Sequence, residues 1–312
     1  MGVQTSGEER ISVQHDRMAY WGFVGLAVAV AACWFFNVAY YREAQLEHPV
    51  FLDHYIEAES GSGVVFYLYV LENRSETNRI ERIRIPELED AQVSRSWNDS
   101  YRYQDLAHFE VFLDQEMASE LYFENWEHAE TPIMIGQVEV MYTDGSVSTE
   151  NIGEIRLYPR LYNTDKPLSA QDKIMEAQRG QSTVVAQENL KITGVDYNEA
   201  SRLGNRLELY WGQGSEVGEW DFERPEEDRI IGKPIHEVQF PMELKLGEDV
   251  TVRYRFRDVT AQDWSKVYQL LPRFRVETKK EIIQARPITI QYSPAPTEDE
   301  VRQFVEERRN RP

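Results

Sequence analysis

Two patterns of hydrophobic residues divide this chain. From Met18 to Tyr41 the residues are almost continuously apolar, and Asn37 is the one strongly polar side chain among them. At ~1.5 Å rise per residue, a helix of this length covers the ~30 Å hydrocarbon core of a bilayer. After Phe51, short runs instead alternate between apolar and polar residues, as in half-buried β-strands. The sequence therefore predicts a single transmembrane helix over 18–41, followed by a mainly β body.

Basic residues on either side of the apolar stretch predict its orientation. Arg10 and Arg17 precede the stretch, whereas Arg42 is the one basic residue close behind it. Because basic residues are retained on the cytoplasmic side of a membrane, this bias favours a cytoplasmic tail over 1–17. The body, which follows a short stalk over 42–50, is then predicted to lie outside the cell membrane.

The single cysteine, Cys33, allows a second interpretation of the same stretch. Val30–Cys33 resembles a bacterial lipobox, in which the helix would be a cleaved signal peptide and the Cys33 thiol would carry a lipid. The following residues, Trp34–Val38, are apolar, where a lipoprotein normally continues with a small polar tether. The apolar run is also longer than the ~7–15 residues of a signal-peptide core. The sequence therefore favours a signal anchor that spans the membrane, with lipidation at Cys33 as the alternative.

Small residues form a seam along the predicted helix. Gly25, Ala29 and Cys33 recur every four residues and so lie on one helical face. Such faces allow a second transmembrane helix to approach closely. We expect this seam to contact another membrane protein or a second copy of the chain, while lipid surrounds the remaining faces.

The first strand-rich segment extends over 51–160. Val64–Leu71 is a run of eight apolar or aromatic residues and predicts a central strand that is covered on both faces. Val138–Tyr142 alternates between apolar and polar residues and leads into Asp144-Gly145, a strong hairpin signal. The segment is therefore predicted to form a first β-sandwich domain.

Residues 161–183 interrupt this alternation. Ser169 is a candidate helix N-cap with Asp172 three residues later, and Gly180 is a candidate terminator. We therefore predict an interdomain linker that contains a short helix. The alternation returns over 184–296, which predicts a second β-sandwich domain.

The two strand-rich segments resemble copies of one plan. Val138–Val140 and Ile155–Pro159 are echoed by Phe274–Val276 and Ile290–Pro294, at offsets of 136 and 135 residues. Both pairs are interpreted as a hairpin that ends at a proline. The prediction is two tandem β-sandwiches of immunoglobulin-like size, ~100 residues each.

A short helix is predicted at the C-terminal end, over 297–312. Thr297 and Glu300 form a capping box, and apolar residues follow at helical spacing. The tip of this helix is basic, through Arg302, Arg308, Arg309 and Arg311. Basic residues are favourable at a helix C-terminus, which accounts for their position; docking on an acidic surface is the alternative.

Charge and cysteine content exclude several classes of protein. Lys and Arg total 34 against 54 Asp and Glu, which gives a net charge of −20, and the first 41 residues contribute only −1 of it. A body of net charge −19 repels nucleic acid, so we expect no nucleic-acid partner. Because the body has no cysteine, a disulfide framework and a cysteine-based zinc site are also excluded.

No motif in the chain indicates catalysis. The six histidines do not occur at metal-ligand spacing, and nucleophile elbows, phosphate loops and dinucleotide fingerprints are missing from the sequence. We therefore predict no catalytic residues, no cofactor and no enzymatic activity.

One acidic segment is a weak candidate for a metal site. Seven carboxylates occur between Glu216 and Asp228, together with Trp220 and Phe222. Carboxylate oxygens in a loop can hold Ca²⁺, and exposed aromatic rings can stack on sugars. The spacing matches no calcium-loop motif, and a solvated loop is the simpler interpretation. The candidate ligands would be Glu216, Glu219, Asp221 and Glu223.

These observations favour a membrane-anchored protein that acts by binding, with its body outside the membrane. The leading hypothesis is an accessory or scaffolding subunit that contacts another membrane protein through the helix. The alternative is a cell-surface module that binds calcium or a polysaccharide through the loop at 216–228.

Overall fold

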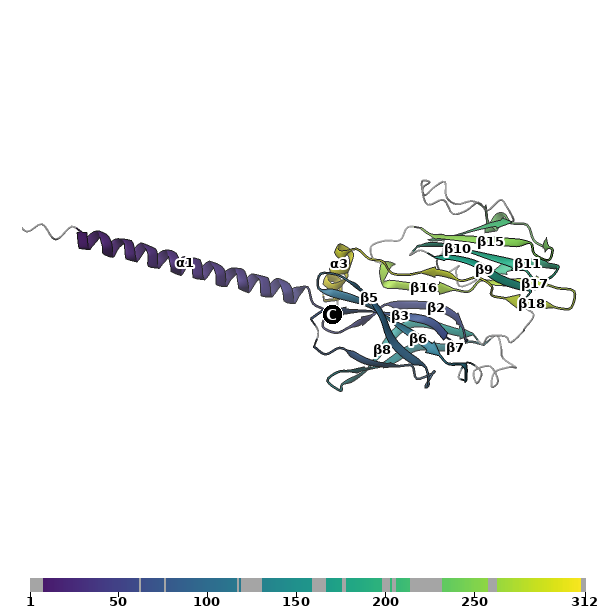
Figure 1. Ribbon diagram of the computed structural model, residues 1–312, viewed down its shortest axis with the longest axis horizontal. Coiled ribbons are helices and arrows are strands. Elements are labelled where there is room, and N and C mark those ends of the chain that lie inside the picture. Colours follow the sequence, from purple (N-terminus) through teal and green to yellow (C-terminus); the bar gives the residue numbers. More distant parts are fainter. Residues whose placement is uncertain are drawn as a thin grey trace, which may run out of the picture. The chain divides into compact units, whose positions relative to one another are not determined.

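The N-terminal helix, α1 (Glu8–Glu43), contains the predicted apolar stretch (Figure 1). In this computed structural model, the described residues are 8–61, 63–75, 77–116, 118, 131–158, 167–175, 178–197, 203, 206–213, 232–257 and 263–309. The part of α1 from Tyr20 to Glu43 is long and apolar enough to cross a membrane, and none of it is buried. Helices of this kind near an N-terminus serve as membrane anchors or as signal sequences.

The described chain divides into two compact units. One comprises residues 1–47 together with 302–312, and the other is the body, residues 48–301. The body is mainly β, as the sequence predicts, and the strands among its described residues form four sheets. We name these sheets A to D.

Sheets A and B contain all the described strands of the first half of the body. Sheet A has the order β1-β3-β6-β5, with β1 (Val50–Phe51), β3 (Gly63–Asn73), β5 (Gln92–Ser100) and β6 (Gln104–Leu113). Sheet B has the order β19-β16-β2-β8-β7-β4, with β2 (Asp53–Glu59), β4 (Ile80–Arg84), β7 (Ile133–Tyr142), β8 (Val147–Tyr158), β16 (Lys266–Leu270) and β19 (Ile290–Tyr292). The hairpin predicted at Asp144-Gly145 is confirmed, because it joins the antiparallel strands β7 and β8 and Gly145 has a φ of +81°.

Sheets C and D contain most strands of the second half. Sheet C has the order β13-β12-β15-β10-β9, with β9 (Leu168–Met175), β10 (Arg179–Ala186), β12 (Leu207–Gln213), β13 (Lys233–Pro234) and β15 (Asp249–Phe256). Sheet D has the order β14-β11-β17-β18, with β11 (Leu190–Asp196), β14 (Met242–Leu244), β17 (Arg273–Glu277) and β18 (Ile282–Ala285). Two short 3₁₀ helices, η5 (Ile235–Glu237) and η6 (Asp263–Ser265), lie between strands.

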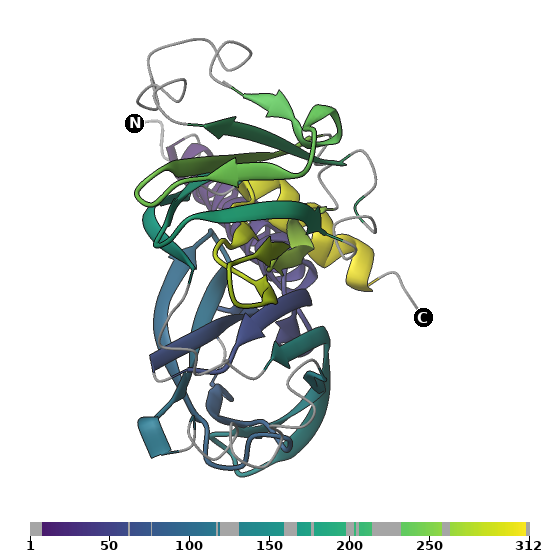
Figure 2. The same ribbon diagram turned by 90° about the vertical axis from the view of Figure 1, so that its right-hand side faces the viewer.

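Sheet B joins the two halves of the body. β16, from the second half, pairs in parallel with β2, and β2 pairs in parallel with β8. Figure 2 shows the strands of the first half in the lower part of the body and those of the second half in the upper part. The predicted segments 51–160 and 184–296 therefore share one sheet, and their number as folding domains stays a prediction.

Two clusters of buried side chains lie among the described residues of the body. Sheets C and D enclose a core around Trp211, Val252 and Phe274. A second cluster places Phe256 of sheet C with Leu270 and Tyr292 of sheet B. Sheet B also meets sheet A, because the backbone N–H of Tyr69 on β3 donates to the ring of His54 on β2. Sheet B thus contacts both of its neighbouring sheets.

The prediction of a short helix within the linker at 161–183 is wrong. Residues 168–175 form β9, which pairs antiparallel with β10. The capping pattern at Ser169 and Asp172 is a local signal, whereas pairing with β10 places Leu168 and Val184 in the core between sheets C and D. Tertiary burial therefore overrides the local preference for a helix.

The prediction that the hairpin is repeated in the second half is also wrong. In the first half, β7 and β8 are hairpin partners, as expected. In the second half, Phe274–Val276 belongs to β17 in sheet D, whereas Ile290–Tyr292 forms β19 in sheet B. Alternation at a similar spacing predicts two strands but does not make them partners.

The C-terminal helix is confirmed as α3 (Glu298–Arg309). Its capping box forms as predicted. The backbone N–H of Thr297 donates to the Glu300 carboxylate at 2.7 Å, and the backbone N–H of Glu300 donates to the Thr297 hydroxyl at 3.4 Å.

Candidate functional site

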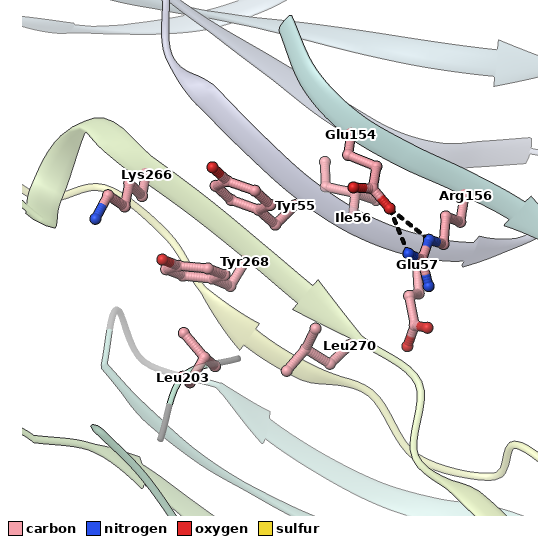
Figure 3. Close-up of a pocket in the computed structure, with 9 residues that line it drawn as sticks. All are labelled: Tyr55, Ile56, Glu57, Glu154, Arg156, Leu203, Lys266, Tyr268 and Leu270. Atoms are coloured by element: carbon pink, nitrogen blue, oxygen red, sulfur yellow. Dashed lines mark hydrogen bonds and ion pairs between the residues drawn. The ribbon is translucent and has the colours of Figure 1, made fainter. Parts of the chain in front are cut away.

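A cleft of about 260 Å³ opens where the two halves of the body share sheet B (Figure 3). Its walls come mainly from β2, β8 and β16, so residues more than 200 positions apart meet in it. The cleft is lined by Tyr55, Ile56, Glu57, Glu154, Arg156, Leu203, Lys266, Tyr268 and Leu270. We call this site the sheet-B cleft.

Strand alternation and register determine which side chains reach the sheet-B cleft. In the parallel pair, Tyr268 lies opposite Tyr55, and on the next strand Glu154 is the partner of Tyr55. Successive side chains point to opposite faces of a strand, so Lys266, Tyr268 and Leu270 share one face. On β2, Tyr55 and Glu57 face the cleft, whereas the His54 ring is directed toward sheet A.

Two stacked tyrosines form the aromatic wall of the cleft. The ring centroids of Tyr55 and Tyr268 lie 5.4 Å apart with an interplanar angle of 18°, and Figure 3 shows both hydroxyls on the same side. Burial, assisted by the nearby Tyr55 and Asp263, raises the pKa of Tyr268 to about 12. The Tyr268 phenol is therefore neutral at physiological pH and can donate a hydrogen bond.

Charged side chains lie around the stacked tyrosines. Arg156 donates from Nε to the Glu154 carboxylate at 2.6 Å, and Figure 3 shows this ion pair to the right of the stacked tyrosines. Lys266 contacts Asp263 at 3.1 Å, and the same carboxylate oxygen accepts a hydrogen bond from Arg206 at 2.6 Å. The cleft therefore combines apolar walls with positive and negative groups whose positions are fixed by partners.

Glu57 connects the sheet-B cleft to the strands behind it. Its carboxylate accepts a hydrogen bond from the backbone N–H of Leu271 at 2.9 Å, and its backbone carbonyl accepts one from the Gln269 side chain at 3.0 Å. The Tyr158 hydroxyl lies 3.4 Å from the Glu57 carboxylate and accepts a hydrogen bond from Arg273 at 2.8 Å. These contacts hold β2 and β8 to the segment around β16 and β17.

Substitutions of Tyr158 test whether this connection stabilises the body. We expect Tyr158→Phe to lower the free energy of unfolding by about 1–2 kcal/mol, because the hydrogen bonds of the buried hydroxyl are lost. Tyr158→Leu should cost more, because it also removes the ring over which the Arg286 guanidinium lies at 4.3 Å. Urea unfolding of both variants, followed by tryptophan fluorescence, measures the difference. Equal stability of the two variants would contradict a role for the ring.

The residues that line the sheet-B cleft are of the kinds that bind a ligand or a side chain. Small-molecule sites usually have volumes of ~300–1,000 Å³ and combine apolar walls with a few fixed polar groups. This cleft has such walls and groups, but its volume lies below that range and suits one or two side chains of a partner. Within the residues that the structure describes, no three His, Cys, Asp or Glu side chains are grouped so that they could hold a metal ion.

The residues predicted from the sequence lie elsewhere. Gly25, Ala29 and Cys33 are all exposed on α1, and a Cβ atom added to Gly25 would meet nothing within 4 Å. Their role as a seam stays a prediction, as does lipidation of Cys33. The acidic candidates Glu216, Glu219, Asp221 and Glu223 lie outside the described residues.

Sequence reasoning missed the sheet-B cleft. Lys266–Leu270 lies in the second strand-rich segment but is not singled out as a strand, and its parallel pairing with β2 has no local signal in the sequence. The local signal that could have indicated the cleft is the pair Lys266 and Tyr268, a charged and an aromatic residue on the same face of the short strand β16.

Comparisons with known proteins give no function. No family model matches this chain, and no curated protein matches it. Among solved structures, the chain is similar to a protein of unknown function from Porphyromonas gingivalis W83, at 10% sequence identity. That alignment covers 78% of this chain and 99% of the other chain, with a TM-score of 0.20.

Proposed function

We propose that this protein is a membrane-anchored, non-catalytic binding protein that serves as an accessory or scaffolding subunit of a membrane complex. The observation that carries the proposal is the apolar surface of α1, on which Phe23 is 73% exposed, Trp34 69% and Phe36 71%. An apolar surface of this size is stable only in lipid or against another protein. Because Arg10 and Arg17 precede the apolar stretch of α1, the proposal has the body outside the membrane.

The sheet-B cleft supplies the second contact of the proposed complex. Its volume of about 260 Å³ suits a side chain that projects from a partner better than it suits a free ligand. Tyr55 and Tyr268 offer a flat aromatic surface, and aromatic residues are enriched at the centres of protein interfaces. The partner is then a membrane protein that contacts both α1 and the body.

Photo-crosslinking in intact membranes tests this function. A photoreactive amino acid in place of Lys266, at the edge of the sheet-B cleft, should crosslink to one specific membrane protein. The matched control is the same substitution at Lys280, an exposed lysine in the turn between β17 and β18. Adducts at both positions, or at neither, would contradict binding at the cleft.

The helix seam is tested in the same experiment. Gly25→Leu with Ala29→Leu should reduce the specific adduct by about tenfold, the effect of losing ~1.4 kcal/mol of helix packing. Leucines at Val28 and Val30, outside the predicted seam, are the control substitutions. An unchanged yield in the seam variant would remove α1 from the proposed partner contact and leave it as a lipid anchor.

A further inference from the structure

Residues 302–309 of the C-terminal helix and the end of α1 belong to the same compact unit. Nη1 of Arg309, in the last turn of α3, donates a hydrogen bond to the backbone carbonyl of Arg42 at 3.4 Å. Arg42 lies one residue before the end of the apolar stretch Tyr20–Glu43. The tip of α3 is therefore attached to α1 at the point where a membrane-spanning helix would leave the hydrocarbon core.

This attachment has a clear physical basis. The last carbonyls of a helix have no partner within it and form the negative end of its dipole, so an arginine there is stabilising. The same unit also contains buried apolar residues, because Leu46, shortly after α1, is 6% exposed and Val305 of α3 is 1% exposed. The observed contact between the tip of α3 and α1 is the Arg309 hydrogen bond.

The attached tip is basic, although the protein as a whole is acidic. Arg42, Arg308 and Arg309 are all exposed, in a chain with a net charge of −20. The Arg308 guanidinium lies 5.3 Å from the centre of the Phe304 ring, so its stem is packed while its charge remains in solvent. Arg302, earlier in α3, lies 4.0 Å from the Glu306 carboxylate, whereas Arg308 and Arg309 are the basic residues of the last turn. We call Arg42, Arg308 and Arg309 the basic tip.

Resting on the membrane anchor of the proposed function, we propose that the basic tip binds the anionic headgroups of the membrane leaflet from which α1 emerges. An arginine near an anionic membrane surface strengthens membrane binding, but this attraction falls off within a Debye length. The arginine must therefore be held close to the surface. The hydrogen bond to Arg42 provides that position. The acidic body is repelled by the same surface, so the attraction would be confined to the basic tip.

Hydrogen exchange of the full chain in lipid nanodiscs tests this proposal. Amides of residues 302–309 are compared in discs of phosphatidylcholine alone and in discs of phosphatidylcholine mixed with phosphatidylglycerol. We expect exchange to be slower in the anionic discs by about fivefold for each arginine engaged. The added protection should disappear at high salt, because these charges lie at the surface.

Two charge-matched variants decide the cause of any protection. R308Q/R309Q should remove the dependence on anionic lipid, whereas K279Q/K280Q, which neutralises two exposed lysines in the turn between β17 and β18, should retain it. Equal exchange in the two kinds of disc would overturn the proposal. It would also be overturned if R308Q/R309Q increased exchange equally in both, since the arginines would then serve only to attach α3 to α1. Loss of the lipid dependence in K279Q/K280Q would assign it to overall charge instead of the tip.

Discussion

Replacing Gly153 by alanine is expected to destabilise the body by roughly 3–5 kcal/mol, because overpacking and backbone strain act at one position. Gly153 has a φ of +94°, which side chains other than glycine rarely adopt. An added Cβ would lie 2.2 Å from the backbone oxygen of His54 and 2.7 Å from its backbone nitrogen. Both atoms belong to the central strand β2, which cannot move without disturbing its pairing with β8 and β16.

Gly145→Ala separates the clash from the strain. Gly145 also has a positive φ, of +81°, and lies at the turn of the β7–β8 hairpin, where an added Cβ would meet nothing within 4 Å. Gly145→Ala should lower the free energy of unfolding by only about 1 kcal/mol, the usual cost of a left-handed conformation for alanine. Urea unfolding followed by tryptophan fluorescence compares the variants. Similar losses for both would show that the close approach of β8 to β2 does not limit stability.

Lowering the pH from 7 to below 4 is expected to remove about 3 kcal/mol of stability through His54 alone. The ring is fully buried. Its Nδ1 lies 2.9 Å from the Ile152 carbonyl, and its Nε2 lies 2.9 Å from the backbone N–H of Tyr69. Nδ1 therefore carries the proton and donates, whereas Nε2 accepts. Protonation of Nε2 would bring two N–H groups against each other.

The sign of this effect follows from the pKa of the ring. Burial lowers the pKa of His54 from 6.5 to about 4 in the folded protein. At pH values between about 4 and 6.5, the His54 ring binds a proton in the unfolded chain but stays neutral in the folded protein. The contribution is therefore complete above pH 6.5 and is lost progressively as the pH falls toward 4.

His54→Gln is the control that isolates this contribution. Glutamine can donate to Ile152 and accept from Tyr69 but has no proton to gain in this range. Urea midpoints of the two proteins between pH 7 and 4 should converge as the pH falls. Burial also lowers the pKa of His108, so it gives a slope of the same sign, but it is present in both proteins and cancels. Parallel curves for the two proteins would contradict the role of His54.

Elements set by local pattern could be predicted from the sequence. The apolar stretch from Met18, the hairpin at Asp144-Gly145 and the capping box at Thr297 each act within a few residues, and all three occur in the structure. Ser169 also gave a local signal, for a helix, but β9 forms there because burial beside β10 outweighs a single cap. A local signal holds where no stronger long-range contact competes with it.

The sequence by itself determined that this protein has an apolar N-terminal helix, a mainly β body and a capped C-terminal helix, because hydrophobic period and capping are properties of neighbouring residues. Only the tertiary structure decided that β16 pairs in parallel with β2, that Tyr55 meets Tyr268, and that Arg309 reaches the carbonyl of Arg42. These contacts join residues more than 200 positions apart. Many strands share the same alternation, so the choice of partner depends on the packing of all the sheets together.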